Sequence, residues 1–173
     1  MQTTERLILK QPEHDDIDHF FEIYSDPETN LFNPLGPVSD RKIAARILNA
    51  MIEHWEKYKF GAWKIMEKSQ PDVVIGFGGL NYRLYNEELK LNLGFRFGKQ
   101  AWGKGYATEL ARKAIAFGFN EFNKKAIYGL VRPKNAASIN VLEKCGLTPV
   151  AELDDVPGEE KSLIYKIENK TIR

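Results

Sequence analysis

Gln100-Ala-Trp-Gly-Lys-Gly-Tyr-Ala-Thr108 is the stretch of this chain that decides its fold. It follows a strand-like run at Leu89–Phe97 and opens a helix-like run at Tyr106–Phe119. The first N–H groups of a helix have no partner within the helix, and the helix dipole places partial positive charge there. Gly103 and Gly105 lack the Cβ atoms that would keep an anion away from the backbone. The segment therefore predicts a phosphate-binding turn at the start of a helix.

Length and composition limit the classes of function. The 173 residues predict a single domain spanning residues 1–173. With 25 basic and 24 acidic residues the net charge is +1, so the chain has no overall positive field that would attract nucleic acid. No apolar run reaches the roughly 18 residues that span a membrane, and the N-terminus has no apolar signal stretch. We expect a cytoplasmic protein that binds neither nucleic acid nor membrane.

The cysteine and histidine residues do not form a recognisable site. Cys145 is the only cysteine, so an internal disulfide is excluded, and we expect it to pack as a small apolar residue. His14, His19 and His54 are scattered and lack carboxylate or cysteine partners at ligand spacing. We therefore expect no metal site.

Hydrophobic periodicity predicts a mixed α+β fold around one sheet. The expected strands are Arg6–Lys10, Phe60–Glu67, Val73–Leu80, Leu89–Phe97, Ala126–Val131, Thr148–Leu153 and Ser162–Ile167. The expected helices are Pro12–Tyr24, a helix capped by Ser39 and ending near Tyr58, Gly105–Phe119, and Ala136–Lys144. A tight turn at Ser69–Asp72 is expected between two of the strands.

One interpretation of the glycine turn is a nucleotide-triphosphate loop. Gly98, Gly103 and Lys104 match the pattern G-x-x-x-x-G-K. The next residue would then be Ser or Thr, whose hydroxyl binds Mg²⁺, but the chain has Gly105 there. This interpretation predicts a nucleotide-hydrolysing enzyme and magnesium-dependent ATP binding.

A second interpretation is a dinucleotide fingerprint at Gly76, Gly78 and Gly79. The pattern G-x-G-x-x-G needs glycine at Asn81, and the segment continues as a strand instead of a helix. Gly76 and Gly78 more readily indicate a bulge or a close approach of backbones.

A third interpretation is a pyrophosphate held by backbone amides without a metal, as coenzyme A requires. Gln100-x-x-Gly-x-Gly-x-Ala107 resembles the pyrophosphate motif of the GNAT superfamily of acetyl-CoA-dependent N-acetyltransferases. Trp102–Glu109 is similar to the corresponding sequence segment in one branch of this superfamily, the ribosomal-protein alanine N-acetyltransferases. Thr4–Leu9 resembles the opening strand of the family, and Val131–Gly146 resembles its second cofactor element.

The resemblance implies a fold and an activity. The fold is a mostly antiparallel central sheet of about seven strands, flanked by about four helices and splayed between the fourth and fifth strands, Leu89–Phe97 and Ala126–Val131. Acetyl-CoA would bind in this V-shaped opening, and an amine would attack the thioester directly. The acceptor is a protein N-terminus or a small-molecule amine, and a homodimer is plausible from family habit.

The resemblance also implies cofactor-binding residues. They are Phe95, Arg96, Phe97, Gln100, Gly103, Lys104, Gly105, Tyr106, Ala107, Thr108, Asn135 and Ser138. Backbone N–H groups of Gly103–Thr108 would wrap the pyrophosphate, and Lys104 would add a local charge. Backbone groups of Phe95–Phe97 would stabilise the oxyanion and pair with the pantetheine arm.

Asn135 and Ser138 lie three residues apart at a helix start and so face the same side. In the family the residue at Asn135 caps the helix and reaches the cofactor. Ser138 stands where this branch often carries a hydroxyl near the coenzyme sulfur, so Ser138 is the candidate general acid. The alternative is that both residues only cap the helix.

The general base is not assigned. Related sequences frequently carry glutamate where this chain has Asn92, and an amide cannot accept a proton at neutral pH. Glu88 or water could replace it, whereas the nearby Tyr82 and Tyr85 are phenols that stay protonated unless perturbed. This departure motivates an alternative function, a non-catalytic module that senses acyl-CoA.

Overall fold

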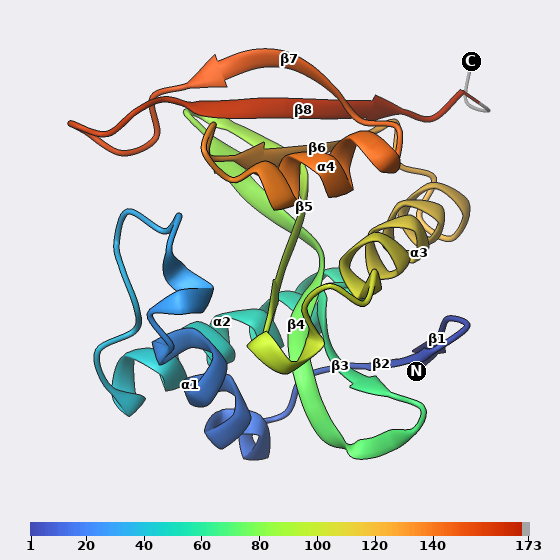
Figure 1. Cartoon of the computed structure of the whole chain (residues 1–173). Helices are drawn as coiled ribbons and strands as arrows, with labels where there is room; N and C mark the ends of the chain where they lie inside the picture. The colour runs from blue at the N-terminus through green and yellow to red at the C-terminus, as the bar shows by residue number, and fades with distance from the viewer. Residues whose placement is uncertain (171–173) are drawn as a thin grey trace. The chain divides into compact units, whose positions relative to one another are not determined.

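The computed structural model describes residues 1–170 and shows helices and a sheet (Figure 1). The elements are β1 (Gln2–Thr3), β2 (Leu7–Lys10), η1 (His14–Asp16), α1 (Ile17–Ser25), η2 (Glu28–Asn30), α2 (Arg41–Tyr58), β3 (Ala62–Glu67), β4 (Gln70–Tyr85), β5 (Glu88–Phe97), η3 (Lys99–Ala101), α3 (Tyr106–Asn120), β6 (Ala126–Val131), α4 (Ala136–Lys144), β7 (Thr148–Leu153) and β8 (Ser162–Glu168). The strand order is β1-β2-β3-β4-β5-β6-β8-β7. The expected mixed α+β class is confirmed, with the short β1 as an additional strand.

The chain forms two compact units. The first comprises Met1–Gly79 and Phe95–Tyr106, and the second comprises Leu80–Gly94 and the chain from Ala107 onward. Strands β4 and β5 therefore each pass from one unit into the other. The expectation of a single domain stays a prediction.

In the first unit, α1 packs against α2, and an aromatic cluster fills the core. Phe20 is fully buried and stacks on Tyr24, with ring centroids 3.9 Å apart. Phe77 of β4 meets Phe20 edge-on at 5.0 Å. Such aromatic pairs add to the free energy gained from burying their apolar area, so they fix α1 on this part of the sheet.

The structure corrects two helix starts. Asp40, not Ser39, caps α2, because its carboxylate accepts hydrogen bonds from two amides of the first turn at 2.8 and 2.9 Å. A carboxylate also suits the positive end of the helix dipole better than a hydroxyl. The helix expected from Pro12 begins at Ile17, after a 3₁₀ turn in which Asp16 accepts from the Glu13 amide at 2.7 Å.

The turn expected at Ser69–Asp72 begins one residue too late and ends three residues too late. Strand β3 ends at Glu67 and β4 already begins at Gln70, so only Lys68 and Ser69 form the turn. Pro71 lies next to the first residue of β4, where the ladder tolerates a missing N–H. The proline in the sequence therefore marked the beginning of the strand and not the turn.

Gly76 allows β4 and β5 to approach each other closely, as the sequence predicted. A Cβ on Gly76 would lie 2.7 Å from Cδ1 of Phe97 and 2.8 Å from the carbonyl oxygen of Arg96. The register between β3 and β4 also shifts next to this position, between Ile65 and Met66. Gly76 thus marks a close approach beside a bulge and has no part in a dinucleotide fingerprint.

In the second unit, β8 lies between β6 and β7, and both pairings are antiparallel (Figure 1). Helix α4 packs on β6, where a Cβ on Gly129 would meet Cδ2 of Leu142 at 2.9 Å. Helix α3 approaches the sheet as closely as α4 does, since a Cβ on Gly118 would lie 2.6 Å from Cδ1 of Leu80. Glycine on the helix in one case and on the strand in the other lets each helix lie close to the sheet.

The splay was expected between Leu89–Phe97 and Ala126–Val131, which are part of β5 and all of β6. These strands run parallel, and their registered Cα pair is Asn92 with Tyr128. By contrast, β6 and β8 pair along the whole of β6, from Ala126 to Val131. The short parallel pairing fits the predicted splay.

Replacing Gly79 by alanine should destabilise the first unit strongly. Its φ of +146° is rarely adopted by residues with a side chain, and a Cβ would lie 3.0 Å from both the Gly61 carbonyl oxygen and the Trp63 ring. We expect urea denaturation to show a loss of roughly 2–4 kcal/mol, since backbone strain and overpacking combine. Gly36→Ala is the control because Gly36 has φ +70° in open space, and its expected loss is about 1 kcal/mol. Equal losses in the two variants would contradict the packing argument.

Candidate functional site

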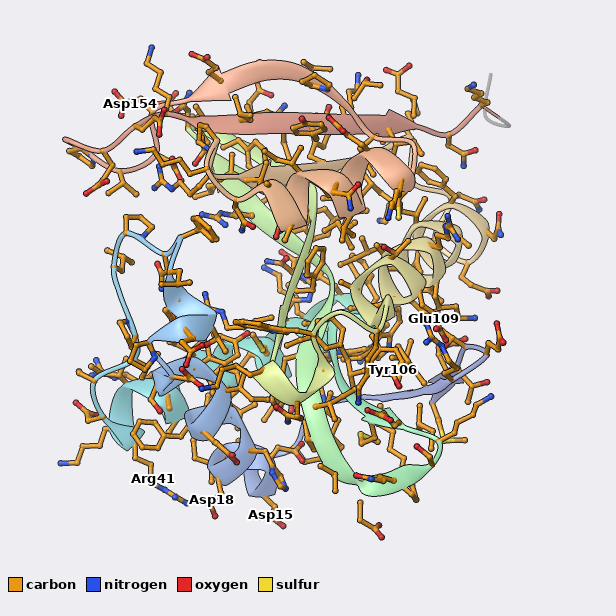
Figure 2. The ribbon with its side chains drawn as sticks, in the orientation of Figure 1. Asp15, Asp18, Arg41, Tyr106, Glu109 and Asp154 are labelled. Atoms are coloured by element: carbon orange, nitrogen blue, oxygen red, sulfur yellow. The ribbon has the colours of Figure 1, made fainter. Side chains whose placement is uncertain are left out.

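The glycine turn lies between η3 and α3 and adopts the conformation that its sequence requires. Gly103 has φ +73° and Gly105 has φ +79°, both in the left-handed region. A Cβ on Gly103 would meet no atom within 4 Å, so the backbone conformation, and not crowding, demands glycine there. The turn is exposed and leads directly into α3 at Tyr106 (Figure 2). Exposed amides at a helix N-terminus are suited to binding an anion.

Two residues outside the turn hold it in place. Nη1 of Arg6 donates to the Lys104 carbonyl oxygen at 2.8 Å, and its guanidinium lies 4.6 Å from the centroid of the Tyr106 ring. Glu67 accepts from Nζ of Lys104 at 3.2 Å. Neither residue was predicted as a site residue. The sequence could have indicated Arg6, because it lies in the Thr4–Leu9 segment that resembles the opening strand of the family. No sequence feature indicated Glu67.

Lys104 is paired in this structure, and the pairing sets the charge at the turn. Burial alone would raise the pKa of Glu67, but hydrogen bonds from Lys104 and Tyr106 outweigh it and bring that pKa below its usual value. Glu67 is therefore ionised at neutral pH. An anion on the turn would compete with Glu67 for the Lys104 ammonium. Lys104 would therefore attract an anion less strongly than an unpaired lysine at this position.

The end of β5 provides the next predicted residues. Phe97 is buried, and its ring centroid lies 6.5 Å from that of Phe95. The Phe97 carbonyl accepts a hydrogen bond from Nε1 of Trp102 at 3.0 Å, which ties the turn back to the strand. Gln100 is exposed, and its side chain folds over the space that a Cβ on Gly98 would occupy. The first unit thus brings together the predicted residues from Phe95 to Tyr106.

The second unit contains the remaining predicted residues. Asn135 caps α4, because its Oδ1 accepts from the Ser138 amide at 3.1 Å. Ser138 is half-buried on the first turn of this helix, and the cap bond uses its amide and not its hydroxyl. Ala107 and Thr108 lie in the first turn of α3. Cys145 packs nearby with its sulfur 3.8 Å from the Thr108 carbonyl oxygen, and burial raises the pKa of its thiol.

The residue in place of the family glutamate belongs to a buried hydrogen-bond network. Asn92 is 5% exposed, accepts from the Tyr85 hydroxyl at 2.7 Å and donates to Oδ1 of Asn81 at 3.2 Å. Burial raises the pKa of Tyr85 well above its usual value. Asn92 has no proton-accepting function here, and Tyr85 keeps its proton to donate to Asn92.

Glu88 is no better placed as a base. It is fully exposed and forms a salt bridge with Lys90. The hydrogen bond from Lys90 lowers the pKa of Glu88, which makes its carboxylate a weaker base. Tyr82 accepts a hydrogen bond from Nζ of Lys124 at 2.9 Å. The three side chains considered from the sequence are therefore all engaged elsewhere.

Residues 1–170 lack the grouped side chains of a metal site and a helix of membrane-spanning character. In this range no group of three His, Cys, Asp or Glu side chains is placed to hold a metal ion. His14 pairs with Oδ1 of Asn49 at 3.0 Å, and His54 with the Phe60 carbonyl oxygen at 2.8 Å. None of the helices described in this range is both long and apolar enough to cross a membrane.

Comparisons with known proteins agree with this geometry. Residues 6–148 match the family model described as an acetyltransferase (GNAT) domain. An uncharacterized N-acetyltransferase, p20 from Bacillus licheniformis, is 30% identical over 93% of this chain and 89% of its own length. An acetyltransferase of the GNAT family from Bacillus anthracis has a similar fold, with a TM-score of 0.79, 22% identity and coverage of 96% of both chains.

A further solved structure holds coenzyme A. Spermidine N-acetyltransferase from Vibrio cholerae, in complex with CoA and spermine, is 17% identical, with a TM-score of 0.75 and coverage of 94% of this chain and 95% of that one. At this identity the likeness shows the fold alone, whereas the family model covers most of the chain. The protein therefore belongs to the GNAT family of acetyltransferases and uses acetyl-CoA as its acyl donor.

Proposed function

We propose that this protein transfers an acetyl group from acetyl-CoA directly to a primary amine, and that both units serve as one N-acetyltransferase domain. The observation that carries the proposal is the turn at Gly103 and Gly105, with left-handed glycines at the N-terminus of α3. The residues of this turn suit a pyrophosphate, because their amides are exposed and no Cβ shields them. Lys104 would add a positive charge, for which an anion would compete with Glu67.

Coenzyme A supplies an acetyl thioester, whose carbonyl carbon an amine can attack. In the first unit, backbone N–H groups of Phe95–Phe97 would stabilise the negative charge that develops on the carbonyl oxygen. The same stretch would pair with the amides of the pantetheine arm, as a peptide adds to the edge of a sheet. The Phe97 side chain is buried in the core. The side chain therefore packs, while the backbone of this strand is the part that would bind the cofactor.

In the second unit, Ser138 would give a proton to the leaving thiolate. Its backbone N–H is held by Asn135, while its side chain is half-buried and not part of the cap bond. This division between amide and hydroxyl supports Ser138 as the general acid and Asn135 as the residue that orients it.

The acceptor is a protein N-terminus or a small-molecule amine. The resemblance to the ribosomal-protein branch supports the first, and the spermidine acetyltransferase among the solved structures supports the second. A second candidate function, an acyl-CoA sensor without turnover, is favoured by Asn92 in its buried network. Coenzyme A thiol release in the presence of a broad panel of amines would argue against the sensor.

Gly103→Ala should weaken acetyl-CoA binding. Alanine disfavours the left-handed φ of +73° and places a methyl group on the exposed side of the turn, so we expect the calorimetric Kd to rise at least about tenfold. Gly158→Ala is the matched control, since Gly158 has φ +82° in equally open space but lies on the β7–β8 loop. An unchanged Kd in Gly103→Ala, or an equal rise in both variants, would reject the turn as the pyrophosphate site. ATP with Mg²⁺ should give no binding isotherm with the unmodified protein.

Ser138→Ala should lower kcat by at least about 100-fold, as expected for loss of a positioned proton donor. The Kd of acetyl-CoA should stay close to that of the unmodified protein, because the cap bond uses the amide and not the hydroxyl. Asn135→Ala removes the cap bond instead and should lower the free energy of unfolding by about 1 kcal/mol. Rapid-mixing kinetics at saturating substrate test kcat, and an unaltered rate of the chemical step would remove Ser138 from the mechanism.

The pH dependence should follow the acceptor and not the enzyme. If water takes the proton, only the neutral amine reacts, so kcat/KM rises with pH and levels off above the pKa of that amine. For a peptide N-terminus the plateau is expected from about pH 8, and for an alkylamine from about pH 10. Rates with both acceptors should be measured with the unmodified protein and with Glu88→Gln. A plateau at the same pH for both acceptors would instead reveal an enzyme base.

A further inference from the structure

Residues 26–38, which connect α1 to α2 in the first unit, expose apolar side chains. Leu31 is 70% exposed and Leu35 is 84% exposed. A segment that buries little apolar surface gains little stability from the hydrophobic effect. Val38 at its end packs against the core of the first unit, and polar contacts hold the residues before it.

Asn30 is the centre of those contacts. It is 4% exposed, and its amide donates to the carbonyl oxygens of Tyr24 at 2.9 Å and Asp26 at 2.8 Å. Its Oδ1 accepts from Nδ2 of Asn33 at 3.1 Å. Asn33 in turn donates to the Gly36 carbonyl oxygen at 2.7 Å. This chain of amides forms the frame of residues 26–38.

Arg96 joins the frame to β5. Its Nη1 donates to Oδ1 of Asn30 at 2.5 Å, and its guanidinium lies 4.5 Å from the centroid of the Tyr24 ring. Hydrogen bonds from a charged donor are shorter and stronger than neutral ones. Lys99, which lies just after β5, makes a second connection to the segment: its Nζ donates a hydrogen bond to Oε1 of Glu28 at 2.7 Å. The segment is thus bound to the strand by two cations that lie three residues apart.

We propose that Arg96 is a positioning residue whose side chain couples β5 to residues 26–38, holding this segment beside the thioester for the acceptor amine. The inference rests on the proposed function, in which the backbone of Phe95–Phe97 binds acetyl-CoA. Acetyl-CoA bound to this backbone would reduce the motion of the Arg96 main chain. Through its hydrogen bond to Asn30, the guanidinium would then reduce the motion of residues 26–38 as well. In this proposal Arg96 faces the cofactor with its backbone and residues 26–38 with its side chain.

Hydrogen exchange tests the coupling in the intact protein, with and without acetyl-CoA. The reporting amides are those of Asn33, Gly36 and Val38, each hydrogen-bonded within the segment or to Tyr24. In the unmodified protein, acetyl-CoA should slow their exchange by about tenfold, a free-energy change of about 1.4 kcal/mol. In Arg96→Met, which keeps an unbranched side chain on Tyr24 but has no donor, acetyl-CoA should bind and leave these amides unprotected.

Two further variants make the result specific. Arg96→Lys keeps one charged donor and should restore part of the protection. Arg41→Met removes a guanidinium from the exposed pair with Asp18, which joins α2 to α1 away from β5, and should behave as the unmodified protein (Figure 2). With any amine that the unmodified protein acetylates, Arg96→Met should raise KM for the amine while leaving the Kd of acetyl-CoA unchanged.

The outcomes separate the two proposals. If the unmodified protein binds no acetyl-CoA by calorimetry, the proposed function fails. If it binds acetyl-CoA but the reporting amides are not slowed, or if Arg96→Met shows the same slowing, the coupling is overturned and the proposed function stands. A rise in the Kd of acetyl-CoA in Arg96→Met would also overturn it, because Arg96 would then act on the cofactor alone.

Discussion

The positive φ angles of Gly103 and Gly105 are the constraint on which the entry into α3 depends. They let the chain leave β5, pass through the turn and enter α3 while residues 102–105 stay exposed. A turn with two left-handed residues is not stable by itself, and three contacts within the first unit hold it. Arg6 binds the Lys104 carbonyl, Glu67 binds the Lys104 ammonium, and Trp102 binds the end of the strand.

In the first unit, two arginine side chains each hold an exposed segment in place. Both the turn and residues 26–38 lie at the surface and bury little apolar area, so the hydrophobic effect cannot fix them. Arg6 donates to a backbone carbonyl of the first, and Arg96 donates to the buried amide of Asn30 in the second. Each guanidinium also lies over a tyrosine ring, Tyr106 in one case and Tyr24 in the other. A planar cation with several N–H donors is suited to both contacts at once.

The second unit shows why a GNAT chain can retain its fold without the frequent strand glutamate. Asn92 accepts from the Tyr85 hydroxyl and pairs in register with Tyr128, so it satisfies polar groups at the point where β5 and β6 meet. A glutamate there would be ionised in a buried site or would have to take up a proton. The amide keeps the network neutral.

The sequence by itself determined the class of fold, most strand and helix ranges, the glycine turn before α3 and the family, because these depend on local periodicity and on glycine and capping residues. It also predicted the close approach at Gly76 and the cap at Asn135. It placed the α2 cap at Ser39 instead of Asp40 and the hairpin turn too late, because neighbouring polar residues are equally good candidates until amide directions are known. Only the tertiary structure decided what holds the turn and the α1–α2 segment. Arg6 and Lys104, or Asn30 and Arg96, are far apart in the chain, and nothing local in a sequence specifies which distant donor reaches which acceptor.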